Sequence, residues 1–175
     1  MEWKEELQQH TKEAEKVVQG YLPEETGHQK LLIEASNYSV LVGGKRLRPM
    51  IMLESFKAFG GTGNVVEPFM AALEMIHSGS LVHDDLPCMD NDEYRRGNLT
   101  TWKKYGYDMA VLAGDKLFIY AFETAAKAFA LTDRADLVGK AISILANKAG
   151  IYGMIGGQSV DVEYTDRPVT KSQLE

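Results

Sequence analysis

The sequence predicts an all-α protein, and three of its features support that prediction. Apolar residues recur at helical spacing (i, i+3, i+4, i+7) along almost the whole chain. The alternation of apolar and polar residues that marks a half-buried strand is absent, apart from an ambiguous stretch at 159–163. Glycine and proline interrupt the helical pattern at intervals, so we expect several helices, joined by short loops, that pack as a bundle.

Proline and glycine set apart the first three helical segments. Residues 2–20 carry a thin apolar stripe among many charges and end before Pro23. The segment 28–42 has its apolar residues on one helical face and ends at two glycines. The segment 47–59 begins near Pro49, whose missing N–H costs little in the first turn of a helix.

The rest of the chain is expected to hold three longer helices. Pro68 opens an apolar helix over 69–82. Residues 87–107 are polar and irregular, which predicts a loop region. Residues 108–131 and 134–156 are Ala-rich with helical spacing. The final letters, TKSQLE, are typical of the beginning of a further helix.

Composition excludes several classes of protein. The chain has 175 residues, 45% hydrophobic and 25% charged, as is ordinary for a globular protein. A net charge of −6 argues against a nucleic-acid or anionic-membrane partner. No uncharged apolar run approaches the ~18 residues of a membrane helix, and the N-terminus lacks the apolar core of a signal peptide. One cysteine cannot make an internal disulfide, so we expect a cytoplasmic protein without stable membrane insertion.

The most informative stretch is LVHDDLPCMDNDEYRRG, which holds five carboxylates within residues 84–93. A solvated acidic loop is one interpretation. The stretch directly follows the apolar helix, however, so Asp84 and Asp85 are expected near the interior, where carboxylates need cations or donors. Mg²⁺ meets that need when phosphates share the coordination. Pro87 interrupts the helix, and a two-residue bulge there would return Asp90 to about the i+4 position beside Asp84.

Basic residues lie before and after the acidic cluster. GGKRLRP places three cations at the start of a helix, with Lys45 and Arg48 on one face. The helix dipole disfavours cations at that end, which suggests a bound anion; an ordinary solvated basic turn is the alternative. Arg95 and Arg96 either neutralise the nearby aspartates or clamp phosphate with their planar donor forks.

Two further signals are weaker. His77 lies seven residues before Asp84, on the same helical face within about 20°, so a structural role and a functional role are equally favoured. The segment GIYGMIGGQSVDVE follows a helix and does not fit the dinucleotide-binding pattern. Its small residues, three and four apart, suggest that helices approach closely there. Gln158 follows them and could face the same cavity as the acidic cluster.

Taken in order, these motifs resemble those of the trans-isoprenyl diphosphate synthases, the family of farnesyl and geranylgeranyl diphosphate synthases. GGKRLRP, EMIHSGSLVHDDLPCMDNDEYRRG, LAGDKL and GMIGGQSVD occur in the family's order, from about residue 30 to the last residue. The stretch DDLPCMD resembles the family's first Asp-rich motif in its DDxxxxD form. The resemblance implies the isoprenoid synthase fold, an all-α bundle around a central cavity, and a homodimer at full length.

The resemblance also implies a prenyltransferase. Such an enzyme condenses isopentenyl diphosphate with dimethylallyl or geranyl diphosphate, and Mg²⁺ draws the diphosphate off the allylic substrate. We expect farnesyl diphosphate as product, with some geranylgeranyl diphosphate. Carried onto matching positions, the resemblance implies that Asp84 and Asp90 are Mg²⁺ ligands, with Asp85 supporting, and that Arg95 binds the allylic diphosphate. It implies that isopentenyl diphosphate is bound by Lys45, Arg48, His77 and Arg96. Gln158 matches a glutamine near the substrate diphosphate. Control of the product's chain length is assigned to Gly79 and Ser80, one helical turn below the expected metal site. Because Gly79 has no side chain, it leaves the pocket for the product's hydrocarbon tail open.

Some features depart from the family pattern. Leu99 and Trp102 stand where the family often has Pro and His. The family's second Asp-rich motif and further lysines lie beyond residue 175. We therefore expect residues 1–175 to be the N-terminal part of a single isoprenoid synthase domain, inactive or nearly so alone. The alternatives are a non-catalytic half-length subunit or partner of a synthase, and a terpene cyclase, which would not need the residues assigned to isopentenyl diphosphate.

Overall fold

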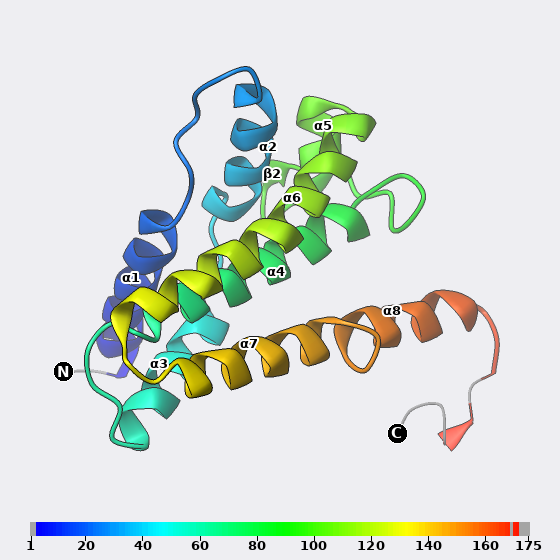
Figure 1. Cartoon of the computed structure of the whole chain (residues 1–175). Coiled ribbons are helices and arrows are strands. Elements are labelled where there is room, and N and C mark those ends of the chain that lie inside the picture. The colour runs from blue at the N-terminus through cyan, green and yellow to red at the C-terminus, as the bar shows by residue number, and fades with distance from the viewer. Residues whose placement is uncertain (1–2, 169, 172–175) are drawn as a thin grey trace. The chain divides into compact units, whose positions relative to one another are not determined.

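The computed structural model describes residues 3–168, 170 and 171, and nearly all of its regular structure is helical (Figure 1). The elements are α1 (Trp3–Gly20), α2 (Lys30–Leu41), α3 (Leu47–Ala58), α4 (Glu67–Asp84), β1 (Tyr94–Arg95), β2 (Asn98–Leu99), α5 (Thr101–Tyr105), α6 (Tyr107–Ala126), the 3₁₀ helix η1 (Lys127–Leu131), α7 (Ala135–Ala149) and α8 (Met154–Glu163). The all-α prediction is confirmed. Among the described helices, none combines the length and apolar character needed to cross a membrane. The helix start expected at the C-terminus falls largely on 172–175, outside the described residues.

The chain divides into two compact units, Met1–Asp133 and Arg134–Glu175. The first contains α1 to α6 and the hairpin of β1 and β2, and it carries all the predicted site residues except Gln158. The second contains α7 and α8. The single domain expected from the sequence stays a prediction.

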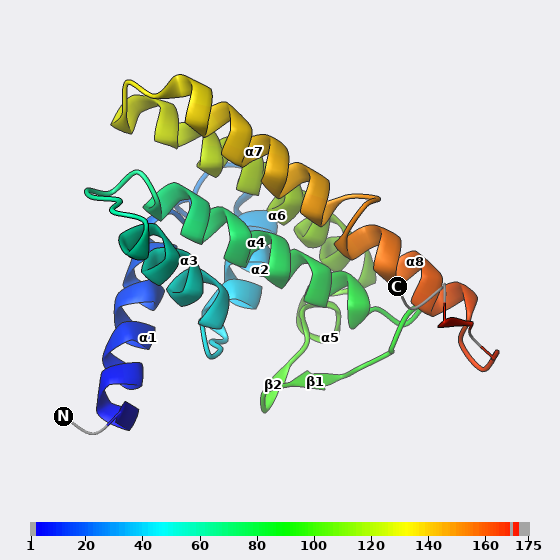
Figure 2. The same ribbon diagram turned by 90° about the horizontal axis from the view of Figure 1, so that it is seen from below.

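The centre of the first unit is the contact between α4 and α6, which lie side by side in both views (Figures 1 and 2). Small residues make this close approach possible. A Cβ atom added to Gly79 would lie 3.2 Å from Cβ of Leu117 and 3.3 Å from the carbonyl oxygen of Gly114. A Cβ atom on Gly114 would in turn overlap the ring of His83. The two glycines therefore set how closely the end of α4 can approach α6.

A second group of buried side chains joins α1, α3 and α4. It consists of Ala14, Met50, Val66 and Met70, with Val17, Met52, Leu53 and Phe56 packed against it. Burial of such apolar side chains is the main favourable contribution to holding helices together. This cluster fixes α3 against α4, and α3 begins with the basic segment noted in the sequence.

The region 87–107, predicted to be irregular, contains a short hairpin and a short helix. Tyr94 pairs with Leu99 and Arg95 with Asn98 in an antiparallel register. The two residues between the strands, Arg96 and Gly97, have φ angles of 53° and 81°, as in the type I′ turns that favour glycine. Strands of two residues are too short to produce an alternating pattern, which is why the sequence did not predict them.

The glycine-rich segment of the second unit also differs from expectation. The helix predicted over 134–156 ends at Ala149, and α8 begins after a turn. A Cβ atom at Gly153 would overlap the carbonyl oxygen of Lys148, and one at Gly156 would overlap that of Ile151. The interpretation that these small residues let helices approach was therefore wrong for Gly153 and Gly156, because here they allow the backbone to fold closely on itself. The ambiguous stretch 159–163 is helical, within α8.

Candidate functional site

The acidic stretch begins where α4 ends, at Asp84. The backbone N–H of Asp90 donates to the carbonyl oxygen of Asp84 at 2.9 Å. This bond spans six residues, two more than in an α-helix, so the chain around Pro87 contains the two-residue excess that the sequence suggested. Asp84 is half-buried and Asp90 is exposed. The loop therefore returns the backbone of the second aspartate to the helix end that carries the first.

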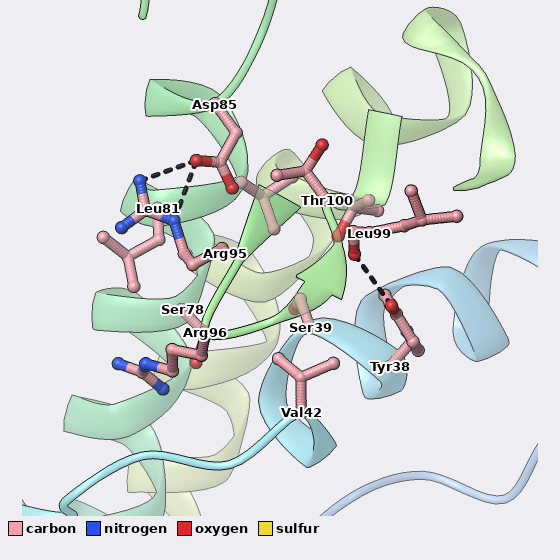
Figure 3. Close-up of a pocket in the computed structure, with 12 residues that line it drawn as sticks. Tyr38, Ser39, Val42, Ser78, Leu81, Asp85, Arg95, Arg96, Leu99 and Thr100 are labelled. Carbon is pink, nitrogen blue, oxygen red and sulfur yellow. Dashed lines mark hydrogen bonds and ion pairs between the residues drawn. The ribbon is translucent and has the colours of Figure 1, made fainter. Parts of the chain in front are cut away.

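Asp85 is paired with Arg95 of β1 (Figure 3). The side chain of Arg95 donates from Nε at 2.8 Å and from Nη2 at 2.6 Å to the same oxygen, Oδ1 of Asp85. Asp85 is only 3% exposed, and this burial raises the pKa of its carboxyl even though Arg95 acts in the opposite direction. The hydrogen bond with Asp85 raises the pKa of Arg95. In this geometry Asp85 holds the hairpin arginine at the acidic loop.

Three other hydrogen bonds hold the hairpin and the loop. The hydroxyl of Tyr38, on α2, donates to the carbonyl oxygen of Leu99 at 2.7 Å. Nε1 of Trp102 and Oγ1 of Thr100 both donate to the carbonyl oxygen of Asp92, at 2.7 and 2.8 Å. Of the two positions that depart from the family pattern, Trp102 thus contacts the acidic segment at Asp92 and Leu99 contacts Tyr38 of α2, neither of which the sequence revealed. The role of Tyr38 was also missed, and no sequence signal marks it.

Two of the predicted isopentenyl diphosphate ligands, Arg48 and Arg96, act electrostatically on a third, His77 on α4. Burial lowers the pKa of His77, and the positive charge of Arg48 lowers it further. Glu74 opposes these effects on the pKa, whereas Arg96 adds to them. Arg48 comes from α3 and Arg96 from the hairpin turn, so two distant parts of the sequence place positive charge near one imidazole. Lys45, at the same end of α3, is exposed.

Arg96 lies against the two glycines before α3. Its Nη1 atom donates to the carbonyl oxygen of Gly43. A Cβ atom on Gly44 would overlap the same guanidinium. Arg95 and Arg96 both line a small pocket between α2, the end of α4 and the hairpin. Figure 3 shows the neighbouring arginines with separate positions, Arg95 at Asp85 and Arg96 apart from it.

For one cation of GGKRLRP, Arg46, the structure does not support the interpretation made from the sequence. Arg46 was grouped with Lys45 and Arg48 as a sign of a bound anion. In the structure Arg46 is buried and paired with Glu15 and Glu74, whereas Lys45 and Arg48 are exposed. The anion-binding interpretation therefore applies to two of the three cations, because internal carboxylates already neutralise the third.

The remaining predicted residues have other surroundings. Gly79 lies against α6, so helix packing accounts for a glycine there, and its role in chain length stays a prediction. Ser80 is half-buried, and its Oγ donates to the carbonyl oxygen of His77 at 2.8 Å. Gln158 is on α8, in the second unit, and its role stays a prediction.

The acidic loop fits a magnesium ion that shares its ligands with phosphate. Among the residues that the structure describes, no three His, Cys, Asp or Glu side chains gather closely enough to hold a metal ion. The backbone bond from Asp90 to Asp84 nevertheless brings two carboxylate-bearing residues to the same end of α4. Mg²⁺ usually binds one or two protein carboxylates and fills its octahedron with phosphate oxygens and water. This donor set thus suits Mg²⁺ bound together with a diphosphate.

Comparison with known proteins gives consistent results. The farnesyl diphosphate synthase of Geobacillus stearothermophilus is 40% identical over 169 residues, covering 97% of this chain and 57% of that protein. The farnesyl diphosphate synthase of Micrococcus luteus is 42% identical over 147 residues, covering 84% and 50%. The chloroplastic geranylgeranyl pyrophosphate synthase of Catharanthus roseus is 49% identical over 129 residues, covering 74% and 36%. The chain thus spans about half the length of these relatives or less.

Solved structures agree on the fold. The apo structure of an FPP/GFPP synthase from Zymomonas mobilis superposes with a TM-score of 0.89 at 33% identity, covering 98% of this chain and 62% of that one. A geranyltransferase from Legionella pneumophila gives the same TM-score and identity, covering 98% and 60%. The chain matches the polyprenyl synthetase family over residues 29–175. Motif order, fold and relatives together show that this chain belongs to the polyprenyl synthetase family.

Proposed function

We propose that this chain carries the first Asp-rich motif and the isopentenyl diphosphate site of a prenyltransferase. The enzyme condenses isopentenyl diphosphate with dimethylallyl or geranyl diphosphate to farnesyl diphosphate, with geranylgeranyl diphosphate as a second product. One observation supports this most strongly. Two adjacent hairpin residues serve different charged clusters, since Arg95 pairs with Asp85 at the acidic loop and Arg96 acts on His77 at the basic cluster. Such an arrangement suits two diphosphates bound side by side.

Each cluster has a distinct task in this proposal. Asp84 and Asp90 would hold Mg²⁺, which would supply positive charge to stabilise the departing diphosphate. Arg95 donates to oxygens of the allylic diphosphate with its planar fork. The condensation breaks the allylic carbon–oxygen bond, forms a carbon–carbon bond from the double bond of isopentenyl diphosphate, and releases a proton.

The basic cluster holds the second substrate. Lys45, Arg48 and Arg96 bind its diphosphate as cations, and His77 donates a hydrogen bond to it. Because the pKa of His77 is lowered by burial and by Arg48, the imidazole is neutral in the free protein at neutral pH. Fixing both substrates by their diphosphates aligns the reacting carbons, which supplies much of the rate enhancement in a two-substrate reaction.

Two measurements test the proposal. Calorimetry of the 175-residue chain should detect isopentenyl diphosphate without metal, and geranyl S-thiolodiphosphate, an analogue that resists ionisation, only with Mg²⁺. Condensation is then measured with labelled isopentenyl diphosphate for this chain joined to the C-terminal part of the Geobacillus stearothermophilus synthase. Farnesyl diphosphate from the joined protein supports the proposal. Binding of both ligands with no condensation would favour the non-catalytic subunit instead, and binding of neither would contradict both.

A further inference from the structure

We infer that Arg46 is a positioning residue for the isopentenyl diphosphate site: it fixes Lys45, Arg48 and His77 relative to one another and adds no attraction of its own for the substrate. This inference rests on the proposed function, because it assigns to Arg46 a part in that site. The motif GGKRLRP by itself does not separate Arg46 from its neighbours; the contacts in the structure do.

The guanidinium of Arg46 joins three helices at the start of a fourth. Arg46 is 2% exposed and directly precedes α3. Its Nη1 donates to Oε1 of Glu74, on α4, at 2.6 Å. Its Nη2 donates to the carbonyl oxygen of Val40, on α2, at 2.5 Å, and to Oε1 of Glu15, on α1, at 3.1 Å. Nε donates to Oε2 of Glu15. This set of bonds needs the fixed fork of arginine, which a lysine ammonium cannot reproduce.

The charge around Arg46 is already balanced. Two carboxylates face one guanidinium, so the group of Arg46, Glu15 and Glu74 is negative in total when all three are ionised. The hydrogen bonds with the two glutamates raise the pKa of Arg46 despite its burial, so it remains charged. An approaching diphosphate is therefore not attracted by Arg46. Lys45 and Arg48, both exposed, supply that attraction.

The backbone at Arg46 links its anchoring to the orientation of its neighbours. Its φ angle is 49°, in the left-handed region that is unfavourable for residues other than glycine. Such a conformation persists when surrounding contacts determine it, and the buried guanidinium provides these contacts. Because Lys45 precedes Arg46 directly and Arg48 follows two residues later, release of the guanidinium would let the start of α3 relax and turn both cations away.

The same guanidinium sets the distance between α3 and the histidine. Glu74 lies three residues before His77, about one turn earlier on α4. The bond between Arg46 and Glu74 therefore fixes the beginning of α3 against the turn of α4 that leads to the imidazole. Arg46 and Glu74 also act on the pKa of His77, in opposite directions, as expected for a pair one turn away from the imidazole.

Two substitutions in the 175-residue chain test the inference. Arg46→Lys keeps the charge and loses the fork. We expect its affinity for isopentenyl diphosphate to fall about tenfold, which corresponds to about 1.4 kcal/mol of binding free energy. Its affinity for geranyl S-thiolodiphosphate with Mg²⁺ should stay within about twofold, because Asp84, Asp90 and Arg95 are held separately. Arg134→Lys, at an exposed ion pair, is the matched control and should change neither affinity.

Glu74→Gln separates the effect of positioning on substrate binding from the effect of charge. It also tests the inference if Arg46→Lys fails to fold. This change removes a negative charge near the site, so a purely electrostatic effect would strengthen the binding of an anion. Loss of positioning weakens it, which is the expected result. Stronger binding in Glu74→Gln, unchanged binding in Arg46→Lys, or an equal loss for both ligands would overturn the inference. Failure of the unsubstituted chain to bind isopentenyl diphosphate would contradict the proposed function itself.

Discussion

The backbone N–H of Asp90 is bonded to the carbonyl oxygen of Asp84 at 2.9 Å, across a loop of six residues. The bond uses main-chain atoms only, so it brings the two aspartates together without requiring a contact between their carboxylates. Two like charges held near each other repel, and a divalent cation relieves that repulsion. In the proposed function, this backbone bond arranges the loop for Mg²⁺ before the ion or the diphosphate arrives.

Replacing Asp84 by alanine should abolish the Mg²⁺-dependent binding of geranyl S-thiolodiphosphate and lower the turnover of the joined enzyme by orders of magnitude. The helical circular dichroism should not change, because the carbonyl of residue 84, which holds the loop, is retained. Asp133→Ala, at an exposed aspartate, is the control. Near-normal Mg²⁺-dependent binding in Asp84→Ala would remove Asp84 from the site.

Asp85→Asn should behave differently from Asp84→Ala. The asparagine keeps an oxygen that Arg95 can donate to, so Mg²⁺-dependent binding should be weakened but not abolished. Burial raises the folded-state pKa of Asp85, so ionising this carboxyl costs stability as the pH rises above about 4, through the folded-state pKa. The melting temperature of the unsubstituted chain should therefore include a decrease from this ionisation, and that of Asp85→Asn should not. An identical pH dependence of melting in both proteins would show that ionisation of Asp85 does not destabilise the folded protein.

The sequence predicted the helices well because a helical pattern persists over many residues. It predicted the acidic loop because Pro87 and the spacing of Asp84 and Asp90 are local features. The neutralisation of Arg46 was not predictable in this way. Its partners Glu15 and Glu74 lie 31 and 28 residues away in the sequence, and nothing in the local charge pattern distinguishes a cation paired inside the protein from one that awaits a ligand.

The helical period also predicted that His77 faces the acidic loop, but not what surrounds it. The positive charge of Arg96, in a hairpin whose strands are two residues long, lowers the pKa of His77. Likewise, the sequence showed a glycine at position 79 but not the helix packed against it. Contacts between distant segments depend on the fold, so local spacing predicts which residue types are present and leaves their partners undetermined.

Arg48→Gln should raise the pKa of His77, because burial and the charge of Arg48 are the two main causes that lower it. Since the folded-state pKa is depressed, His77 contributes full stability above its unfolded value of about 6.5, and the contribution is lost as the pH falls through the folded-state pKa. NMR titration of the imidazole resonances measures the pKa, with His77→Gln for assignment. Isopentenyl diphosphate should also raise this pKa, since an anion stabilises the imidazolium. A pKa that neither change moves would place His77 away from both Arg48 and the diphosphate.

The last prediction concerns Gly79 and Ser80, the two residues assigned to chain length. The sequence-based expectation is that Gly79→Tyr shifts products toward shorter chains. Because a Cβ atom at Gly79 would already lie 3.2 Å from Leu117 and 3.3 Å from Gly114 on α6, a tyrosine must also push the two helices apart. Overpacking of this kind costs typically 1–3 kcal/mol, or roughly 2–12 °C in melting temperature for a chain of this size.

Ser80→Tyr is the cleaner test of the tail pocket. The side chain of Ser80 is half-buried, and among the described residues its hydroxyl bonds within its own helix, to the carbonyl of His77. We expect Ser80→Tyr to melt closer to the unsubstituted chain than Gly79→Tyr does, and to shorten the products of the joined enzyme. Unchanged products in both variants would show that this turn of α4 does not line the tail pocket. A Gly79→Tyr protein that melts like the original would show that α6 yields at this position without cost.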